Sequence, residues 1–241
     1  YDQPLIVKTG PKKGMQVTDG DRKFWSFLPL TKPKAPPVKN KKWTNNEIDQ
    51  FVLRKLENAK LIPNGPAEPR VLIRRVYFDL IGLPPTPDEV EAFVNSALRN
   101  PNSALEKVVD RLLASKHYGE RWGRHWLDIA RFAESHGFEQ DYNRPHAYHY
   151  RDFVIKALNA DMPYDQFVKW QLAGDEFAPD NPLAMMATGF LGAGVFPTQL
   201  TEKEFESARY DELDDMANTT GTAMLGLTIG CARCHDHKFD P

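Results

Sequence analysis

The stretch Thr86-Pro87-Asp88-Glu89-Val90-Glu91-Ala92-Phe93-Val94 carries the signals that begin a helix. Thr86 is a residue type that caps helix N-termini, and Glu89 stands three positions later, where a capping box places its reciprocal glutamate. Pro87 occupies the first helical position, where a missing N–H costs little. Apolar residues then recur at helical spacing: Val90, Phe93 and Val94. The stretch therefore predicts a helix with one apolar face.

The same signal recurs elsewhere along the chain. Serine or threonine is followed three residues later by glutamate at three further positions, each of which predicts a capping box: Thr44, Ser103 and Thr201. A helix over residues 72–80 is expected to stop at Gly82. Helical patterns also cover four other segments: residues 118–134, 145–158 and 164–173, and a short stretch around 185–186. Because no alternating pattern is long enough for a sheet, the sequence predicts an all-α, multi-helix domain.

The first part of the chain has a different composition. Residues 29–37 are rich in proline and lysine, which favour an extended and solvated backbone. We therefore expect residues 1–43 to form an extended arm that packs on the outside of a helical domain covering residues 44–241.

Composition and charge exclude some classes of protein. The chain has 241 residues, 41% of them hydrophobic, so it can bury a substantial core. Its formal net charge of -2 argues against nucleic acid as a partner. No run of about 18 apolar residues is present, so no membrane span is expected in this segment. The sequence starts at Tyr1 without a leader pattern, and we expect any export signal to have been removed or to lie upstream.

The segment Cys231-Ala232-Arg233-Cys234-His235 matches the attachment sequence of a c-type haem. Two thioether bonds from Cys231 and Cys234 would hold the porphyrin, and His235 would then be the proximal iron ligand. These are the only two cysteines of the chain. The motif predicts one covalent haem c per chain.

Two other chemistries fit the same residues. Cys231, Cys234, His235 and His237 offer four possible zinc ligands, although structural zinc sites usually draw their ligand pairs from separated segments. The cysteine pair could also form a redox disulfide, but no thioredoxin-like pattern precedes it. The residues alone do not decide between haem attachment, a zinc site and a redox disulfide.

The helix expected over residues 118–134 combines a core face with a polar one. An apolar stripe at helical spacing predicts the buried face: Trp122, Trp126, Ile129 and Ala133. Arg121, His125 and Asp128 share an adjacent face with Phe132. His125 is either a histidine at the edge of the core, paired with a carboxylate, or part of a site.

Several segments between residue 24 and the C-terminus resemble the planctomycete cytochrome c family, in particular its middle module, a domain of unknown function. The first of them are Phe24-Trp25-Ser26-Phe27, Leu72-Ile73-Arg74-Arg75, Asp79-Leu80-Ile81-Gly82-Leu83-Pro84-Pro85-Thr86, Tyr118-Gly119-Glu120-Arg121-Trp122, His125-Trp126-Leu127-Asp128, Tyr150-Arg151-Asp152 and Gln171-Leu172-Ala173-Gly174-Asp175. The last runs from Gly226 through Cys231-Ala232-Arg233-Cys234-His235-Asp236-His237-Lys238-Phe239-Asp240-Pro241.

The resemblance implies a haem-bearing module of an exported multidomain protein, in the periplasm or at the cell surface. It also makes His125 the first choice for the iron ligand opposite His235, with Asp128 as a residue that orients it. His237 lies too close to His235 in sequence to reach over the ring. Other histidines and methionines are alternative ligands: His117, His136, His146, His149, Met216 and Met224.

Three functions are compatible with these expectations. The first is electron transfer to or from a redox partner protein or adjacent domains of the same polypeptide. The second is a haem-dependent oxidoreductase or peroxidase-like enzyme linked to extracellular polysaccharide breakdown, with Arg121, Arg124 and Asp128 shaping an open iron position. The third is a structural haem in a glycan-associated surface protein.

Overall fold

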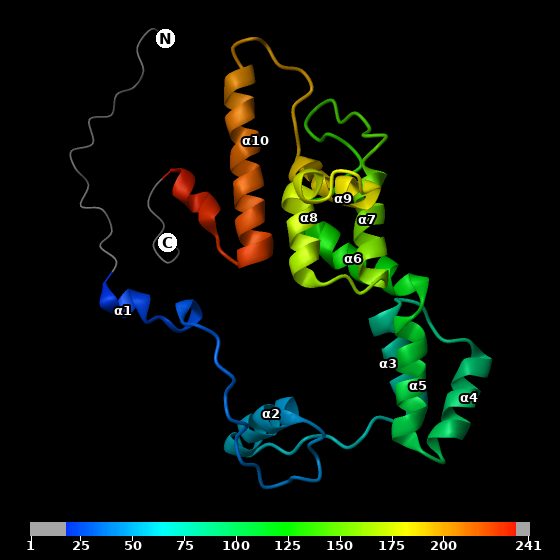
Figure 1. Ribbon diagram of the computed structural model, residues 1–241. Helices are drawn as coiled ribbons and strands as arrows, with labels where there is room; N and C mark the ends of the chain where they lie inside the picture. The colour runs from blue at the N-terminus through cyan, green and yellow to red at the C-terminus, as the bar shows by residue number, and fades with distance from the viewer. Residues whose placement is uncertain (1–17, 235–241) are drawn as a thin grey trace. The chain divides into compact units, whose positions relative to one another are not determined.

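The computed structural model describes residues 18–234, and within this range the chain forms helices and no β-strand (Figure 1). The only bridge of β type among these residues pairs Ser135 with Asn143. The predicted all-α class is confirmed. His235 and His237 lie outside the described residues, and so does the start of the predicted arm.

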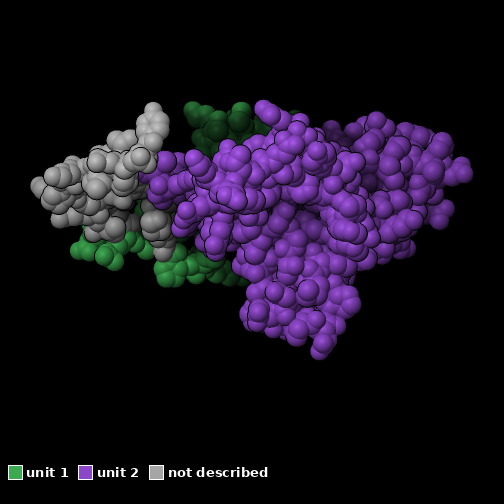
Figure 2. All heavy atoms as spheres, turned by 90° about the horizontal axis from the view of Figure 1, so that it is seen from above, with its two compact units in different colours: residues 1–67 green, residues 68–241 purple. Residues whose placement is uncertain are grey.

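The chain divides into two compact units, Tyr1–Ala67 and Glu68–Pro241 (Figure 2). In the first unit, the short helix α1 (Asp19–Arg22) and the 3₁₀ turn η1 (Trp25–Phe27) precede α2 (Glu47–Asn58). The backbone amides of Lys39 and Asn40 donate to Glu57 Oε1 at 2.8 and 3.2 Å, which ties the segment before α2 to that helix. The first unit thus contains both the predicted arm and α2, and the domain limits 1–43 and 44–241 stay a prediction.

The second unit begins with three helices around a small core. They are α3 (Pro69–Leu80), α4 (Pro87–Ala97) and α5 (Pro101–Leu113). Their buried side chains meet in one cluster: Ile73, Tyr77, Phe93, Ala97, Ala104 and Leu112. Gly82 adopts a φ of +72°, a left-handed conformation that favours glycine, so the chain leaves α3 where the sequence predicted.

The following helices surround a larger core. They are α6 (Lys116–Ile129), α7 (Tyr148–Asn159), α8 (Tyr164–Phe177) and α9 (Pro182–Ala187), followed by the 3₁₀ segment η2 (Thr188–Ala193). Eight buried residues form this core: Ala130, Tyr150, Phe153, Val154, Ala157, Phe167, Ala187 and Phe190.

Helix α10 (Phe205–Thr220) leads to a π-type turn, η3 (Gly221–Leu225), and then to the 3₁₀ turn η4 (Ile229–Arg233). Ala223 and Met224 of η3 pack against the larger core. Arg131 Nε donates to Asp215 Oδ2 of α10 at 2.7 Å, and the same guanidinium donates to the carbonyl oxygens of Phe190 and Leu191 at 3.4 Å. These contacts join the C-terminal segment to the core that precedes it.

One of the four predicted capping boxes is confirmed. The backbone amide of Glu89 donates to Thr86 Oγ1, and the Glu89 carboxylate accepts from the Thr86 amide in return. At Thr201 the carboxylate of Glu204 does accept from the threonine amide and hydroxyl, but α10 begins only at Phe205. The Thr201 pair therefore closes a turn before the helix instead of capping it.

The other two predicted caps were wrong because a nearby asparagine performs the task. Asn46 Oδ1 accepts from the Asp49 amide at the start of α2, so Thr44 is not the cap. Asn100 Oδ1 likewise accepts from the Ser103 amide, with Pro101 as the first residue of α5. Asparagine caps helices as well as serine or threonine does.

Two predicted helix ends were also displaced. The helix expected to start at Pro145 begins at Tyr148, after a turn. The helix expected to end at Gly174 continues to Phe177 across a kink at Ala173, whose φ and ψ are -156° and 45°. None of the helices in the described part of the chain is long and apolar enough to cross a membrane.

Candidate functional site

Cys231 lies in the short turn η4, and Cys234 is the residue that caps its C-terminal end. Cys231 and Cys234 are both exposed, and neither forms a disulfide. The Cys234 amide donates to the Cys231 carbonyl at 3.3 Å, which closes the turn between them. In a 3₁₀ turn, side chains three residues apart lie on the same side. The two thiols are therefore open to solvent on one side of the turn.

The chain reverses between α10 and η4 through two glycines. Gly226 has a φ of +67°, a conformation that other residues adopt at a cost. Gly221 permits close approach, because a Cβ added there would lie 2.7 Å from Ile229 Cδ1. The Leu227 amide donates to the Gly221 carbonyl at 3.1 Å. This reversal brings η4 back against α10.

Helix α10 holds η4 through side chains on one face. Arg233 Nη1 donates to Asp214 Oδ2 at 3.2 Å, and its Nη2 donates to Asp211 Oδ1. The pKa of Arg233 is raised by its hydrogen bonds to Asp211 and Asp214 and by the charges of both carboxylates. The Gly230 amide donates to Asn218 Oδ1 at 3.1 Å. We name Asp211, Asp214 and Asn218 the turn mount.

These observations fit covalent haem attachment. Two free, exposed thiols on one side of a turn are accessible to both reactive edges of one porphyrin. No group of three histidine, cysteine or acidic side chains in residues 18–234 is placed to hold a metal ion. The zinc alternative needs His235 and His237, which lie outside this range, and it stays open with the disulfide alternative.

His125 lies in a different setting, an aromatic groove of about 290 Å³. Its ring is exposed and meets the Trp122 ring edge-on at a centroid distance of 5.5 Å. The groove is lined from α6, α7, α8 and the loop between α7 and α8, including Tyr118, Ile129, Leu158, Met162 and Tyr164. The groove lining includes no residue of η4. His125 as an iron ligand therefore stays a prediction.

Arg121 and Asp128 do not line this groove. The Arg121 side chain lies against Gly82, where an added Cβ would be 2.9 Å from Arg121 Cδ. Its Nε is buried and makes no hydrogen bond in the described structure. Asp128 is exposed near the end of α6. The structure thus places Arg121 at the turn after α3, and a role of either residue toward a haem stays a prediction.

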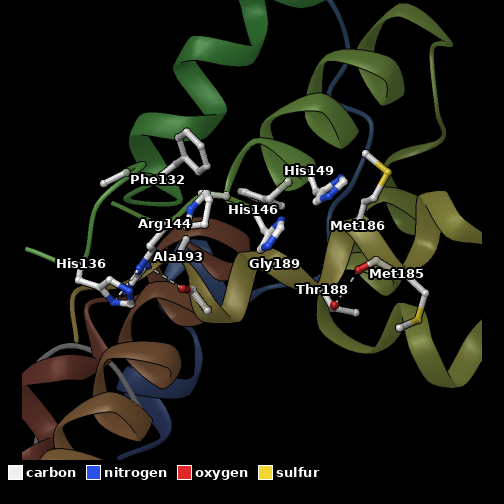
Figure 3. Close-up of a pocket in the computed structure, with 15 residues that line it drawn as sticks. Phe132, His136, Arg144, His146, His149, Met185, Met186, Thr188, Gly189 and Ala193 are labelled. Atoms are coloured by element: carbon white, nitrogen blue, oxygen red, sulfur yellow. Dashed lines mark hydrogen bonds between the residues drawn. The ribbon is translucent and has the colours of Figure 1, made fainter. Parts of the chain in front are cut away.

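A second pocket, of about 440 Å³, brings together three of the alternative iron ligands (Figure 3). His136, His146 and His149 all line it, as do Met185 and Met186. The His146 and His149 rings lie 6.2 Å apart between centroids. The sequence predicts each of these histidines only as a separate candidate ligand. Folding of the loop onto α7 and α9 places them in one pocket. Imidazole and thioether groups are both iron ligands in haem proteins.

Arg144 fixes one wall of this histidine pocket. Its Nε donates to His136 Nδ1 at 3.2 Å, and its two other nitrogens donate to the Gly192 and Gly194 carbonyls at 3.0 and 2.7 Å. Burial lowers the pKa of Arg144, and nearby Arg131 lowers it further, against the opposing effect of Glu212. Because each of its three guanidinium nitrogens donates within the protein, Arg144 shapes the wall, and the exposed His146 and His149 contribute imidazoles to the pocket.

Neither the turn mount nor Arg144 was predicted from the sequence. The signal for the mount was present, since Asp211, Asp214 and Asn218 recur at helical spacing on one face. Arg233 lies inside the cysteine motif, at one of its two variable positions, which carry no signal of their own. No local pattern distinguished Arg144 from other arginines.

A family model described as PSCyt2, a protein of unknown function (DUF1549), matches residues 47–241. No curated protein and no solved structure matches the chain.

Proposed function

The chain belongs to the PSCyt2 family of proteins of unknown function (DUF1549), and we propose that it is a c-type cytochrome domain that transfers electrons. The membership confirms the resemblance to that domain of unknown function. The family name points to a cytochrome-related domain. The haem and its use in electron transfer belong to the proposal.

The geometry of the cysteine turn is the observation that carries the proposal. Cys231 and Cys234 are exposed and free on one side of η4, and the turn is held against α10 at two points. His235 follows directly in sequence, as covalent haem attachment requires. A dithiol that served only packing would be expected to lie buried, because free cysteine is among the most buried residue types.

Each residue then has a defined task. Cys231 and Cys234 would bond the porphyrin, and His235 would bind the iron. His125 would be the second protein ligand, with the histidine pocket as the alternative source. The haem would supply one-electron chemistry, and an iron with two protein ligands favours electron transfer over substrate binding. We propose a redox partner protein or adjacent domains of the polypeptide as electron donor and acceptor, in the periplasm or at the cell surface.

Two measurements test the proposal together: the mass of the denatured protein and its absorption spectrum. The chain, expressed with a cytochrome maturation system, should be heavier by one haem in denaturing mass spectrometry, and the double variant Cys231→Ala/Cys234→Ala should have the mass of the bare chain. The oxidised wild-type spectrum should be low-spin. A wild-type chain of unmodified mass from a competent host contradicts the proposal.

The histidine pocket favours a second candidate, a haem-dependent oxidoreductase. A pocket of about 440 Å³ with accessible imidazoles is large enough to admit a small substrate. This candidate predicts a high-spin iron with an open position, and a peroxide-dependent oxidation that is lost in His146→Ala or His149→Ala. The spin state of the oxidised protein separates the two functions.

A further inference from the structure

The ion pairs of the turn mount are too exposed to matter much for the stability of the fold. The side chains of Arg233, Asp211 and Asp214 are 46%, 61% and 34% exposed. Exposed ion pairs contribute little to the free energy of unfolding, because water and salt screen them. Their position suggests another task, since Arg233 is the neighbour of Cys234 and lies two residues after Cys231.

The mount restrains the turn on both sides of Cys231. Gly230 precedes Cys231 and donates its amide to Asn218, and the fit is close, because a Cβ on Gly230 would lie 2.5 Å from Asn218 Oδ1. Arg233 bridges two carboxylates one helical turn apart, which suits the fixed fork of donors on a guanidinium. Two anchors three residues apart, Gly230 and Arg233, leave the backbone of Cys231 little freedom.

The mount also sets the local charge. Two carboxylates, Asp211 and Asp214, face one guanidinium, Arg233, so the paired groups carry one net negative charge beside the cysteines. A negative charge near an iron favours its oxidised, more positive form and lowers the reduction potential. Because Arg233 is adjacent to Cys234 in sequence, this charge would act on a haem bonded to that sulfur.

We propose that Asp211 and Asp214 are positioning residues for the haem: they hold Arg233, fix the attachment turn on α10 and lower the reduction potential of the iron. The inference rests on the proposed function, since it needs a haem on Cys231 and Cys234. The proposed function does not by itself require the carboxylates of Asp211 and Asp214 on α10.

The first measurement is the midpoint potential of haem-loaded variants. Asp211→Asn/Asp214→Asn removes two negative charges and leaves Arg233 unpaired, so the potential should rise. Arg233→Gln removes the positive charge and leaves both carboxylates, so the potential should fall. The matched control is Asp165→Asn, which breaks an exposed ion pair with Lys169 on α8 and should leave the potential unchanged. Shifts of opposite sign identify charge as the cause, because mere loosening of the turn would move both variants in one direction.

The second measurement uses the chain without haem. We expect trypsin to cleave after Arg233 faster when the turn leaves α10, so Asp211→Asn/Asp214→Asn should speed this cleavage several-fold relative to cleavage after the exposed Lys60. The Asp165→Asn variant should behave as the wild type. Thermal unfolding of all variants should stay close to that of the wild type, as expected for exposed pairs.

The outcomes separate the two proposals. Equal cleavage rates in the wild type and the double aspartate variant contradict the mount, and potentials that shift in the same direction or not at all contradict its effect on the iron. A chain that takes up no haem contradicts the proposed function, while the cleavage assay still decides whether Asp211 and Asp214 hold the turn.

Discussion

The indole Nε1 of Trp126 donates to Oε1 of Gln171 at 2.8 Å, inside the larger core of the second unit. The Tyr150 hydroxyl donates to the same oxygen at 2.7 Å, and Gln171 is fully buried. The amide nitrogen of Gln171 donates to the Phe167 carbonyl at 3.0 Å. One glutamine therefore satisfies donors from α6 and α7 and fixes both helices to α8.

Replacing this glutamine should destabilise the second unit. Gln171→Leu leaves the Tyr150 hydroxyl without an acceptor, and we expect a loss of about 1–3 kcal/mol in the free energy of unfolding. Chemical denaturation of the wild type and the variant measures it. Gln140→Leu is the control, because the exposed Gln140 makes only a surface bond of 3.3 Å to Gln199. Equal losses in both variants would show that the buried oxygen does not join the helices.

The close approach of α6 to α7 depends on Gly119. A Cβ at this position would lie 2.4 Å from the Ile155 carbonyl oxygen, which belongs to the backbone and cannot rotate away. We expect Gly119→Ala to cost about 1–3 kcal/mol in the free energy of unfolding despite the better helix propensity of alanine. Gly192→Ala, where a Cβ meets nothing within 4 Å, should change stability by less than about 0.5 kcal/mol. Thermal unfolding distinguishes the two, and a neutral Gly119→Ala would contradict this packing.

Glu89 should make stability depend on pH in the acid range. Burial alone would raise the pKa of Glu89, but hydrogen bonds from Tyr77 and Thr86 and the charge of Arg111 outweigh it, so the pKa lies below its usual value of 4.5. A carboxyl group whose pKa is lower in the folded than in the unfolded protein stabilises the fold at pH values above its unfolded pKa. This contribution is lost as the pH falls through its folded pKa. The destabilisation caused by Glu89→Gln should therefore be present at pH 7 and shrink below about pH 4.5.

The control for this pH dependence is Glu106→Gln, an exposed position on α5.

Tyr77 provides a complementary test at high pH. Burial and the neighbouring Glu89 raise the pKa of Tyr77 from 10.0 to about 12. The contribution of Tyr77 to the free energy of unfolding should therefore be complete below pH 10 and decline as the pH rises toward 12. The difference in free energy of unfolding between the wild type and Tyr77→Phe measures it. A difference that grows in this range would refute the assignment.

The helical fold could be predicted because its signals are local. The capping box at Thr86 and the stop at Gly82 each depend on residues within one turn, and both are confirmed. Two caps failed because a nearby asparagine was equally suitable, as where Asn100 replaces Ser103, and the third failed because α10 begins only after the Thr201 turn. The bonds that join Gln171 to Trp126 span 45 residues, and no sequence period reports such a partner.

Only part of the candidate site has a local signal in the sequence. The spacing of Cys231 and Cys234 is a local signal, and the structure places both thiols at the surface. The turn mount needs α10 to lie beside η4, which depends on the reversal at Gly226 and cannot be read from the motif. The convergence of His136 with His146 likewise depends on loop folding.

His125 provides the test of the ligand on the far side of the iron. Its ring is exposed beside Trp122, so its loss should cost the fold little. If His125 binds the iron, His125→Ala should convert a low-spin haem protein to a high-spin or water-ligated form while the covalent haem stays in place. His125→Met should keep six ligands and raise the midpoint potential, because a thioether favours reduced iron.

The matched control for His125 is Glu120→Ala on the same helix, at a residue that is not a candidate iron ligand. Glu120 Oε2 lies 2.6 Å from His117 Nδ1, so this variant breaks a surface pair and should leave the absorption spectrum unchanged. A low-spin spectrum that survives His125→Ala would exclude His125 and direct the search to His146 and His149, whose rings already line one pocket. Met224 is a weaker alternative, because its side chain packs against the larger core and would have to leave it to reach an iron.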